Sequence, residues 1–114
     1  NTICMTHMSH VYPQGANLYF IFIVKMTDPE DFREFHAGIL DAIQKSGASM
    51  SHHHGIGKMF GPWLEGSIGK NEYEVIKALK RHFDPDNIMN PGGTLGLDTP
   101  DEQKRFLGSV KTIK

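Results

Sequence analysis

The sequence predicts an α+β fold, an antiparallel sheet with helices packed on one face. Two β-prone segments lie close together near the N-terminus, amphipathic helical patterns follow them, and no internal repeat is present. The 114 residues, 39% of them hydrophobic, suit a single domain with one modest core. The expected order of strand, strand, helix, strand and helix favours a ferredoxin-like or split arrangement.

The N-terminal segments predict a β-hairpin. Residues 2–11 mix β-branched and polar side chains without helical spacing, and residues 12–15 supply turn formers. Residues 18–24 form an aromatic and β-branched run that is too short for a helix of that apolarity. We expect this run to be the central strand of the sheet, buried on both faces.

A first long helix is predicted over residues 28–46. Thr27 or Asp28 can cap it, because Pro29 fits the first turn and Thr27 with Glu30 matches a capping box. Apolar side chains then recur at spacings of three or four until Ser46 and a glycine end the helix.

Three further elements are expected downstream. Residues 48–51 suit a short third strand, Trp63 begins a short helix, and an apolar stripe predicts a helix over residues 70–83 that ends before Asp84-Pro85. A capping box at residues 99–102 opens a peripheral helix within residues 99–112. The expected core side chains are Phe32, Phe35, Ile39, Trp63, Ile76 and Leu79.

Composition narrows the function classes. Twelve Lys plus Arg against thirteen Asp plus Glu give a formal charge of −1 with no long block of either sign, which argues against nucleic acid as a partner. The longest apolar run is about a third of a membrane-spanning helix, and Cys4 alone cannot form an internal disulfide. We therefore expect a soluble, cytoplasmic protein. The start at Asn1, without an initiator Met, suggests a fragment of a longer protein.

One segment carries most of the candidate chemistry: Ser51, His52, His53, His54, Gly55, Ile56, Gly57 and Lys58. In an extended backbone, His52 and His54 would share one face and His53 the other, so a compact tri-histidine metal site is hard to build. His7 and His10 could complete such a site, but no further ligand pattern supports it, and we expect no metal.

The histidines are better suited to binding or proton transfer. Any single one of them is more often a solvated polar residue, so the cluster is the signal. Gly55 and Gly57 let the backbone approach a flat ring or a phosphate closely, and Lys58 offers a partner for an anion.

The histidine motif, followed by Trp63, a helix and a second motif, resembles the C-terminal end of FAD-linked oxidases of the vanillyl-alcohol-oxidase type. The second motif reads Asp84, Pro85, Asp86, Asn87, Ile88, Met89, Asn90, Pro91 and Gly92. The likeness covers about residues 1–95. The three-histidine form is similar to alkyl-dihydroxyacetonephosphate synthase, whereas related 2-hydroxy-acid dehydrogenases carry Gly-Glu-His-Gly-Ile-Gly. One departure is that residues 59–62 are not basic before Trp63, as they tend to be in the synthases.

The resemblance implies a substrate-binding part of an FAD enzyme, with FAD held mainly by an N-terminal domain of the same protein. It implies that the flavin holds a dihydroxyacetone-phosphate unit while a fatty acid leaves and a fatty alcohol enters, a step of ether lipid synthesis. Tyr12 would be the acid or base, assisted by the three histidines, because a tyrosine of pKa about 10 needs a nearby cation. Lys58 would help to bind the phosphate.

The resemblance places five residues near the flavin: Gly55, Gly57, Asn90, Pro91 and Gly92. The isolated chain would be inactive, a homodimer is possible, and a membrane surface would be met only through a lipid substrate. Two alternatives stay open. The first is an FAD-linked oxidoreductase or dehydrogenase of a hydroxy acid or similar alcohol, and the second is a small metal- or ligand-binding α+β module without catalysis.

Overall fold

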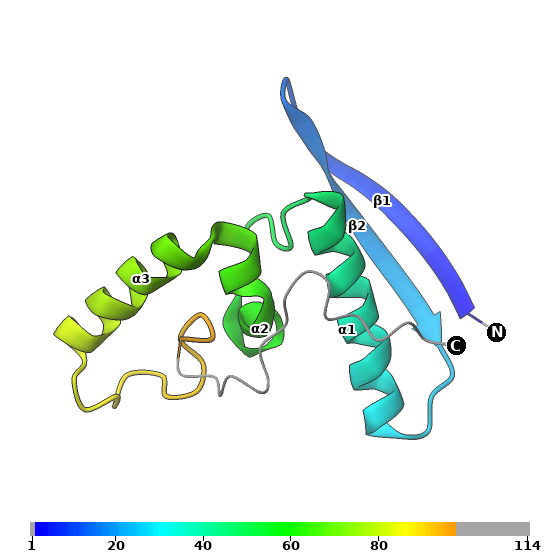
Figure 1. Cartoon of the computed structure of the whole chain (residues 1–114). Coiled ribbons are helices and arrows are strands. Elements are labelled where there is room, and N and C mark those ends of the chain that lie inside the picture. The colour runs from blue at the N-terminus through cyan, green and yellow to red at the C-terminus, as the bar shows by residue number, and fades with distance from the viewer. Residues whose placement is uncertain (1, 98–114) are drawn as a thin grey trace. The chain divides into compact units, whose positions relative to one another are not determined.

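The computed structural model describes residues 2–97, which form two strands and three helices (Figure 1). The elements are β1 (Thr2–Tyr12), β2 (Gly15–Val24), α1 (Pro29–Ser46), α2 (Gly57–Ile68) and α3 (Lys70–Phe83). The chain divides into two compact units, one ending at Phe35 and one beginning at His36. An α+β fold with an antiparallel sheet is confirmed, and the helix expected within residues 99–112 lies outside the described residues.

The first unit is built on an antiparallel hairpin. Thr2 pairs with Val24 and Tyr12 with Gly15, and the register shifts between Ser9 and Val11, where His10 has a φ of 53°. This shift is a β-bulge, which interrupts the regular strand register at His10 and increases the local twist. The predicted hairpin and its turn are therefore confirmed.

The expectation that β2 is a central strand buried on both faces is wrong for the described residues. Its sheet there contains only β1 and β2, and Phe20, Ile21 and Ile23 are about half exposed. The apolar run correctly predicts a strand, but the run alone does not show whether other elements cover one or both faces of that strand. Aromatic packing also occurs in this unit, where the rings of Phe22 and Phe35 meet edge to face with centroids 5.7 Å apart.

The start of α1 follows the predicted capping chemistry. Asp28 Oδ1 accepts a hydrogen bond of 2.8 Å from the Glu30 N–H, which satisfies one of the free donors of the first turn. Phe32, expected in the core, is 51% exposed and is not a core residue.

The core of the second unit lies where α1 packs against α2. Ala37, Leu40 and Trp63 are buried together, with Ile43, Met50 and Phe60 packed against them. Of the expected core residues, Trp63 is confirmed, Phe35, Ile39 and Ile76 are half-buried, and Leu79 is 53% exposed. The buried stripe of α1 is therefore turned by about one residue from the predicted one, toward Ala37 and Leu40.

Buried hydrogen bonds fix α1 to α2 in addition to this packing. Trp63 Nε1 donates to Asp41 Oδ1 at 2.6 Å, and Gln44 Nε2 donates to the Trp63 carbonyl at 2.9 Å. Asp41 and Gln44 are both less than a tenth exposed. Because a buried polar group without a partner is costly, these pairs favour one specific packing of the two helices.

Helix α2 begins at Gly57, six residues before the predicted start at Trp63. The helix includes Gly61 and Pro62, although a Gly-Pro pair in a sequence is typical of a loop. Residues 48–51 form no strand, and the described part of this unit contains no strand with which they could pair. The predicted third strand is therefore wrong.

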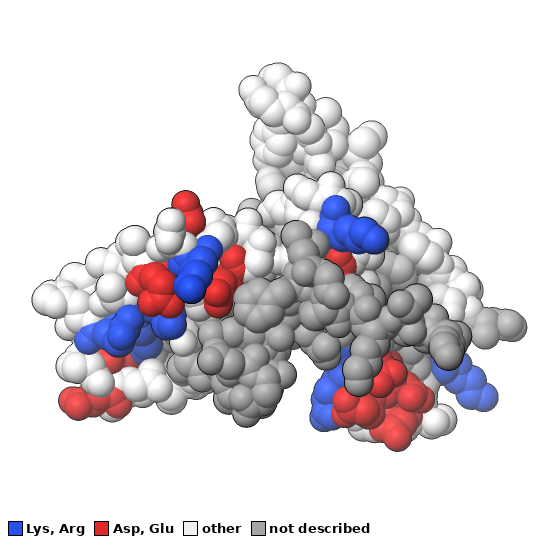
Figure 2. Space-filling view, in the orientation of Figure 1, with Lys and Arg blue, Asp and Glu red and all other residues white. Residues whose placement is uncertain are grey.

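Helix α3 matches its predicted bounds. Its outer surface mixes both signs of charge (Figure 2), with Glu74 paired to Lys77 at 2.8 Å and to Arg81 at 3.7 Å. On its buried side Tyr73 is 1% exposed, and its hydroxyl donates to the Gly96 carbonyl at 2.7 Å. The segment that follows α3 is thus tied back to this helix.

Candidate functional site

The histidine loop, residues 51–56, is the second part of the connection between α1 and α2 and is bent rather than extended. His52, His53 and His54 are exposed, and their rings meet in sequence, with centroids 4.9 Å apart for the first pair and 4.3 Å for the second. The sequence interpretation put His53 on the opposite face for an extended backbone only, and the backbone of this loop is not extended. Bends at consecutive residues remove the period-two alternation on which that expectation rested.

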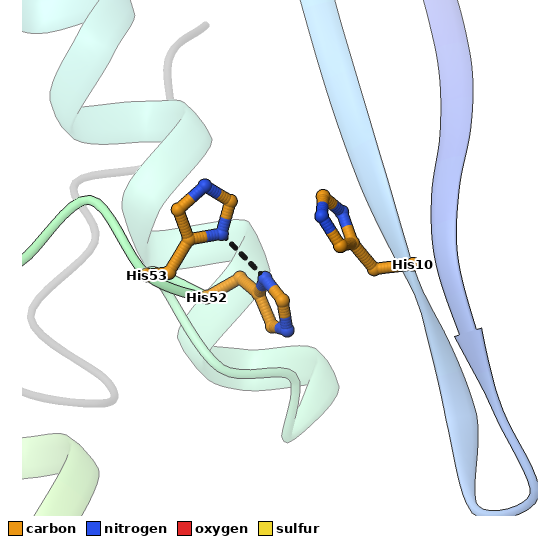
Figure 3. Close-up of side chains that lie close together, drawn as sticks. All are labelled: His10, His52 and His53. Atoms are coloured by element: carbon orange, nitrogen blue, oxygen red, sulfur yellow. Dashed lines mark hydrogen bonds between the residues drawn. The ribbon is translucent and has the colours of Figure 1, made fainter.

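His52 and His53 are joined by a hydrogen bond of 2.7 Å between their Nδ1 atoms (Figure 3). One Nδ1 must donate and the other must accept, so one ring carries its proton on Nδ1 and the other does not. The bonded pair can therefore hold at most one positive charge. Such a pair is suited to giving or taking a single proton.

The N-terminal end of α2 lies directly after this loop. Its first residues are Gly57, Lys58 and Met59, so the first turn has no acidic side chain, and no side chain among the described residues caps it by a hydrogen bond. The free N–H groups and the dipole of a helix N-terminus favour an anion. The ammonium of Lys58 adds to that preference.

Lys58 connects the two motifs recognised in the sequence. Its Nζ lies 4.0 Å from the position that a Cβ on Gly92 would occupy. Gly92 has a φ of 70°, a conformation that suits glycine, and Asn90 has a φ of 49°. The end of the histidine motif and the Asn90-Pro91-Gly92 turn, about thirty residues apart in sequence, therefore meet in the fold.

The turn is held by the segment that leads into it. The buried Asp84 carboxylate accepts the N–H groups of Ile88 at 2.9 Å and Met89 at 3.0 Å, and it pairs with Lys80. The Lys80 hydrogen bond lowers the pKa of Asp84, and the N–H bonds from Met89 and Ile88 lower it further. Asp84 therefore stays ionised well below neutral pH.

Tyr12 lies in the other unit, at the end of β1, where it pairs with Gly15 across the turn and is 49% exposed. Tyr12 therefore lies directly before a glycine-containing turn, as the resemblance implies. Its partnership with the histidines stays a prediction. His7 and His10 are in the same strand, where both rings lie near Tyr19, with centroids 6.1 Å and 6.5 Å away.

His36 shows the ordinary structural role of a histidine. Its ring stacks on Phe60 at 6.1 Å and meets Trp63 edge-on at 6.3 Å, and burial lowers its pKa. His36 thus serves in packing between α1 and α2, in contrast to the exposed rings of the histidine loop.

The glycines beside the histidines have left-handed backbone conformations and open space around their Cβ positions. Gly55 and Gly57 have φ values of 80° and 54°, and nothing lies within 4 Å of the positions that their Cβ atoms would occupy. Backbone without side chains, facing open space, fits the edge or face of a ring such as isoalloxazine. The residues present on this side of the site therefore fit a flavin.

Sequence reasoning missed the residues that hold these loops. Asp84 was taken as part of a helix stop and of the second motif, Tyr73 as one residue of the apolar stripe of residues 70–83, and Gly61 as one of the non-basic residues 59–62. A signal existed for Asp84, since an acidic residue after the last turn of a helix and before a Pro often caps a turn. The contact of Gly61 with Gly96, where added Cβ atoms would lie under 3.0 Å from backbone, had no local signal.

The fold and the site describe an α+β chain in which an exposed histidine loop and a glycine-containing turn lie at the N-terminal end of one helix. Comparison with known families gives this arrangement its class, that of the FAD-linked enzymes. The family model described as "FAD linked oxidases, C-terminal domain" matches residues 2–94. The chain belongs to the FAD-linked oxidase C-terminal domain family.

Several curated proteins are similar to this chain. Alkyldihydroxyacetonephosphate synthase of Dictyostelium discoideum is 34% identical over 98% of this chain and 19% of its own length. The synthase of Trypanosoma brucei brucei is 34% identical over 86% of this chain and 16% of its own length. Glycolate oxidase subunit GlcD of Bacillus subtilis is 36% identical over 60% of this chain and 15% of its own length.

This chain thus spans less than a fifth of the length of these relatives. No solved structure matches it. Across the described residues, none of the helices has the length and apolarity needed to cross a membrane.

Proposed function

We propose that this chain is the substrate-side part of an FAD-dependent enzyme that exchanges an acyl for an alkyl group on dihydroxyacetone phosphate. The observation that carries the proposal is the loop of three touching imidazoles placed at the uncapped N-terminus of α2. The similarity to proteins named alkyldihydroxyacetonephosphate synthase, which extends over 98% of the chain for one of them, supports it.

Each candidate residue has a proposed role that follows from the chemistry of its side chain. His52 and His53 share the proton of their Nδ1–Nδ1 hydrogen bond, and a pair that can gain or lose one positive charge suits donation to a leaving carboxylate oxygen and withdrawal from an entering alcohol. Lys58 and the free N–H groups of the first turn of α2 suit a substrate phosphate. Tyr12 is the proposed acid or base on the hairpin side, and His54 contacts His53 and extends the cluster.

Five residues would line the flavin: Gly55, Gly57, Asn90, Pro91 and Gly92. When bound, the flavin supplies the electrophilic or electron-accepting ring on which the chemistry depends. A domain of the same protein preceding these residues is proposed to hold most of the cofactor. We further propose that the enzyme acts in the cytoplasm, in ether lipid synthesis.

A second candidate is an FAD-linked dehydrogenase of a hydroxy acid. The similarity to glycolate oxidase subunit GlcD favours it, and the non-basic residues 59–62 depart from the synthase pattern. In this candidate one histidine would take the proton of the substrate hydroxyl, and the flavin, when bound, would supply the two-electron acceptor.

The first prediction separates the two candidates in the full-length enzyme. Supplied with acyl-dihydroxyacetone phosphate and a labelled fatty alcohol, it is expected to release fatty acid and incorporate label without bleaching an acceptor dye, because acyl-to-alkyl exchange has no net redox change. Incorporation is measured by extraction of labelled lipid, and dye reduction by absorbance.

D-2-hydroxy acids serve as the competing substrates in the same assay. Dye bleaching by a hydroxy acid, with no label incorporated, would refute the synthase function in favour of the dehydrogenase. A protein purified without any flavin would refute both.

A further inference from the structure

The Asn90-Pro91-Gly92 turn is pinned on its N-terminal side by one buried carboxylate. Asp84 is 7% exposed and uses both of its oxygens, Oδ1 toward the Ile88 N–H and Oδ2 toward the Met89 N–H. Lys80 pairs with the same carboxylate, and its Nζ donates to the Met89 carbonyl at 2.8 Å. Asp84 and Lys80 together therefore hold both polar backbone groups of Met89, the residue directly before the turn.

The segment on the C-terminal side of the turn is anchored to α3. Thr94 Oγ1 donates to the Asn90 carbonyl at 3.1 Å, and the Tyr73 hydroxyl donates to the Gly96 carbonyl at 2.7 Å. Gly96 also lies against Gly61 of α2 so closely that a Cβ on Gly61 would come within 2.8 Å of its Cα. The segment that carries the turn is thus anchored to α3 and α2 on both sides.

The residues of the turn itself are exposed, and Gly92 lies beside Lys58. An exposed turn between two anchors takes its position from the anchors, because its own side chains contribute little packing. A displacement of Met89 would therefore move Asn90 and Gly92 relative to Lys58 and the first turn of α2.

We infer that Asp84 is a positioning residue of the site: through Met89 it sets the place of the Asn90-Pro91-Gly92 turn against Lys58. The inference rests on the proposed function, in which this turn lines the flavin and Lys58 meets the substrate phosphate. Asp84 touches neither flavin nor substrate. Its effect on turnover passes through the backbone that it holds.

The test uses the full-length holoenzyme with D84N, which keeps the size of the side chain but loses its charge and one acceptor oxygen. A second variant, Y73F, releases the opposite anchor by removing one hydroxyl. E74Q is the matched control, since Glu74 is also an acid paired to a lysine but lies on the exposed surface of α3.

Two measurements are made on each variant. Hydrogen exchange followed by mass spectrometry reports the protection of residues 86–92, and turnover is expressed per bound flavin. D84N is expected to speed exchange in residues 86–92 and to lower turnover per bound flavin by about 10- to 100-fold, as misplacement of a reacting group by about 1 Å does. Y73F is expected to give both changes to a smaller extent, and E74Q neither.

A purely structural role would lower the amount of folded, flavin-loaded enzyme but leave turnover per bound flavin unchanged. That result in D84N, or unchanged exchange in residues 86–92, would overturn the inference. If D84N does not fold, Y73F decides the question by the same two measurements. A wild-type protein that binds no FAD would refute the proposed function, whereas the exchange measurement still decides whether Asp84 holds the turn.

Discussion

His53 occupies the middle of the histidine loop, with a hydrogen bond to His52 on one side and the ring of His54 on the other. It is the residue through which a proton or a charge would pass between the outer two rings. All three rings are exposed, so little of the stability of the fold depends on them. Their place in the molecule is thus explained by chemistry more readily than by packing.

His53→Ala is therefore expected to separate function from stability. In the full-length enzyme it should lower turnover by about 100-fold or more, the usual contribution of a general acid or base, while the midpoint of thermal unfolding changes little. Steady-state kinetics and thermal unfolding measured on the same preparation check this.

His82→Ala is the control, because it also removes an exposed imidazole but from the last turn of α3. It is expected to leave turnover unchanged. If His53→Ala has wild-type turnover, His53 does not belong to the catalytic machinery.

At the scale of elements, helix α2 positions the residues of the candidate site. Its N-terminal end follows the histidine loop, its middle meets Gly96 through Gly61, and its buried face carries Trp63 into the core. The bond from Trp63 Nε1 to Asp41 fixes the rotation of α2 on α1. The direction of the first turn of α2, and with it the position of Lys58, follows from these contacts.

Gly61→Ala tests this role of α2. A Cβ there would lie 2.8 Å from Gly96 Cα and 2.9 Å from Gly96 N, and backbone atoms cannot turn aside as a flexible side chain can. We expect a loss of about 1–3 kcal/mol in the free energy of unfolding, although alanine is the better helix former.

Gly38→Ala in α1 is the matched control, because nothing lies within 4 Å of its Cβ position. It should raise the free energy of unfolding by about 0.5–1 kcal/mol. Urea unfolding of both variants checks the pair. Equal effects of the two substitutions would show that Gly61 and Gly96 do not pack as described.

The elements with strong local signals were predictable. The hairpin, α1 with its Asp28 cap, and α3 with its end at Asp84-Pro85 follow from turn formers, periodicity and capping. The start of α2 was not, because Gly57, Gly61 and Pro62 are residues that usually end helices. What allows them here is tertiary contact, above all the close approach of Gly61 to Gly96.

The candidate site was predicted as residue types but not as geometry. The histidines, Lys58 and the Asn90-Pro91-Gly92 turn were chosen from their motifs, and the fold brings Lys58 and Gly92 together. The contact of all three imidazoles was missed, because it depends on bends that an exposed loop adopts for no local reason. Asp84 and Tyr73 were missed as anchors because their partners are backbone groups, which every sequence contains.

At the scale of the whole molecule, the proposed function makes the described residues one side of a site. Both strands of the hairpin carry apolar side chains that are about half exposed or more, among them Ile3, Met8, Val11 and Leu18. The chain covers less than a fifth of the length of its relatives. In keeping with the proposed function, we propose that FAD binds in a longer protein, with the histidine loop and the Asn90-Pro91-Gly92 turn as its contacts on this side.

If these two segments face one flavin, hydrogen exchange of the full-length protein with and without FAD will show it most directly. We predict that FAD increases the protection of residues 52–58 and of residues 88–92 together, while peptides from the outer surface of α3 change little. Protection that rises elsewhere in the protein, with both segments unchanged, would contradict the account.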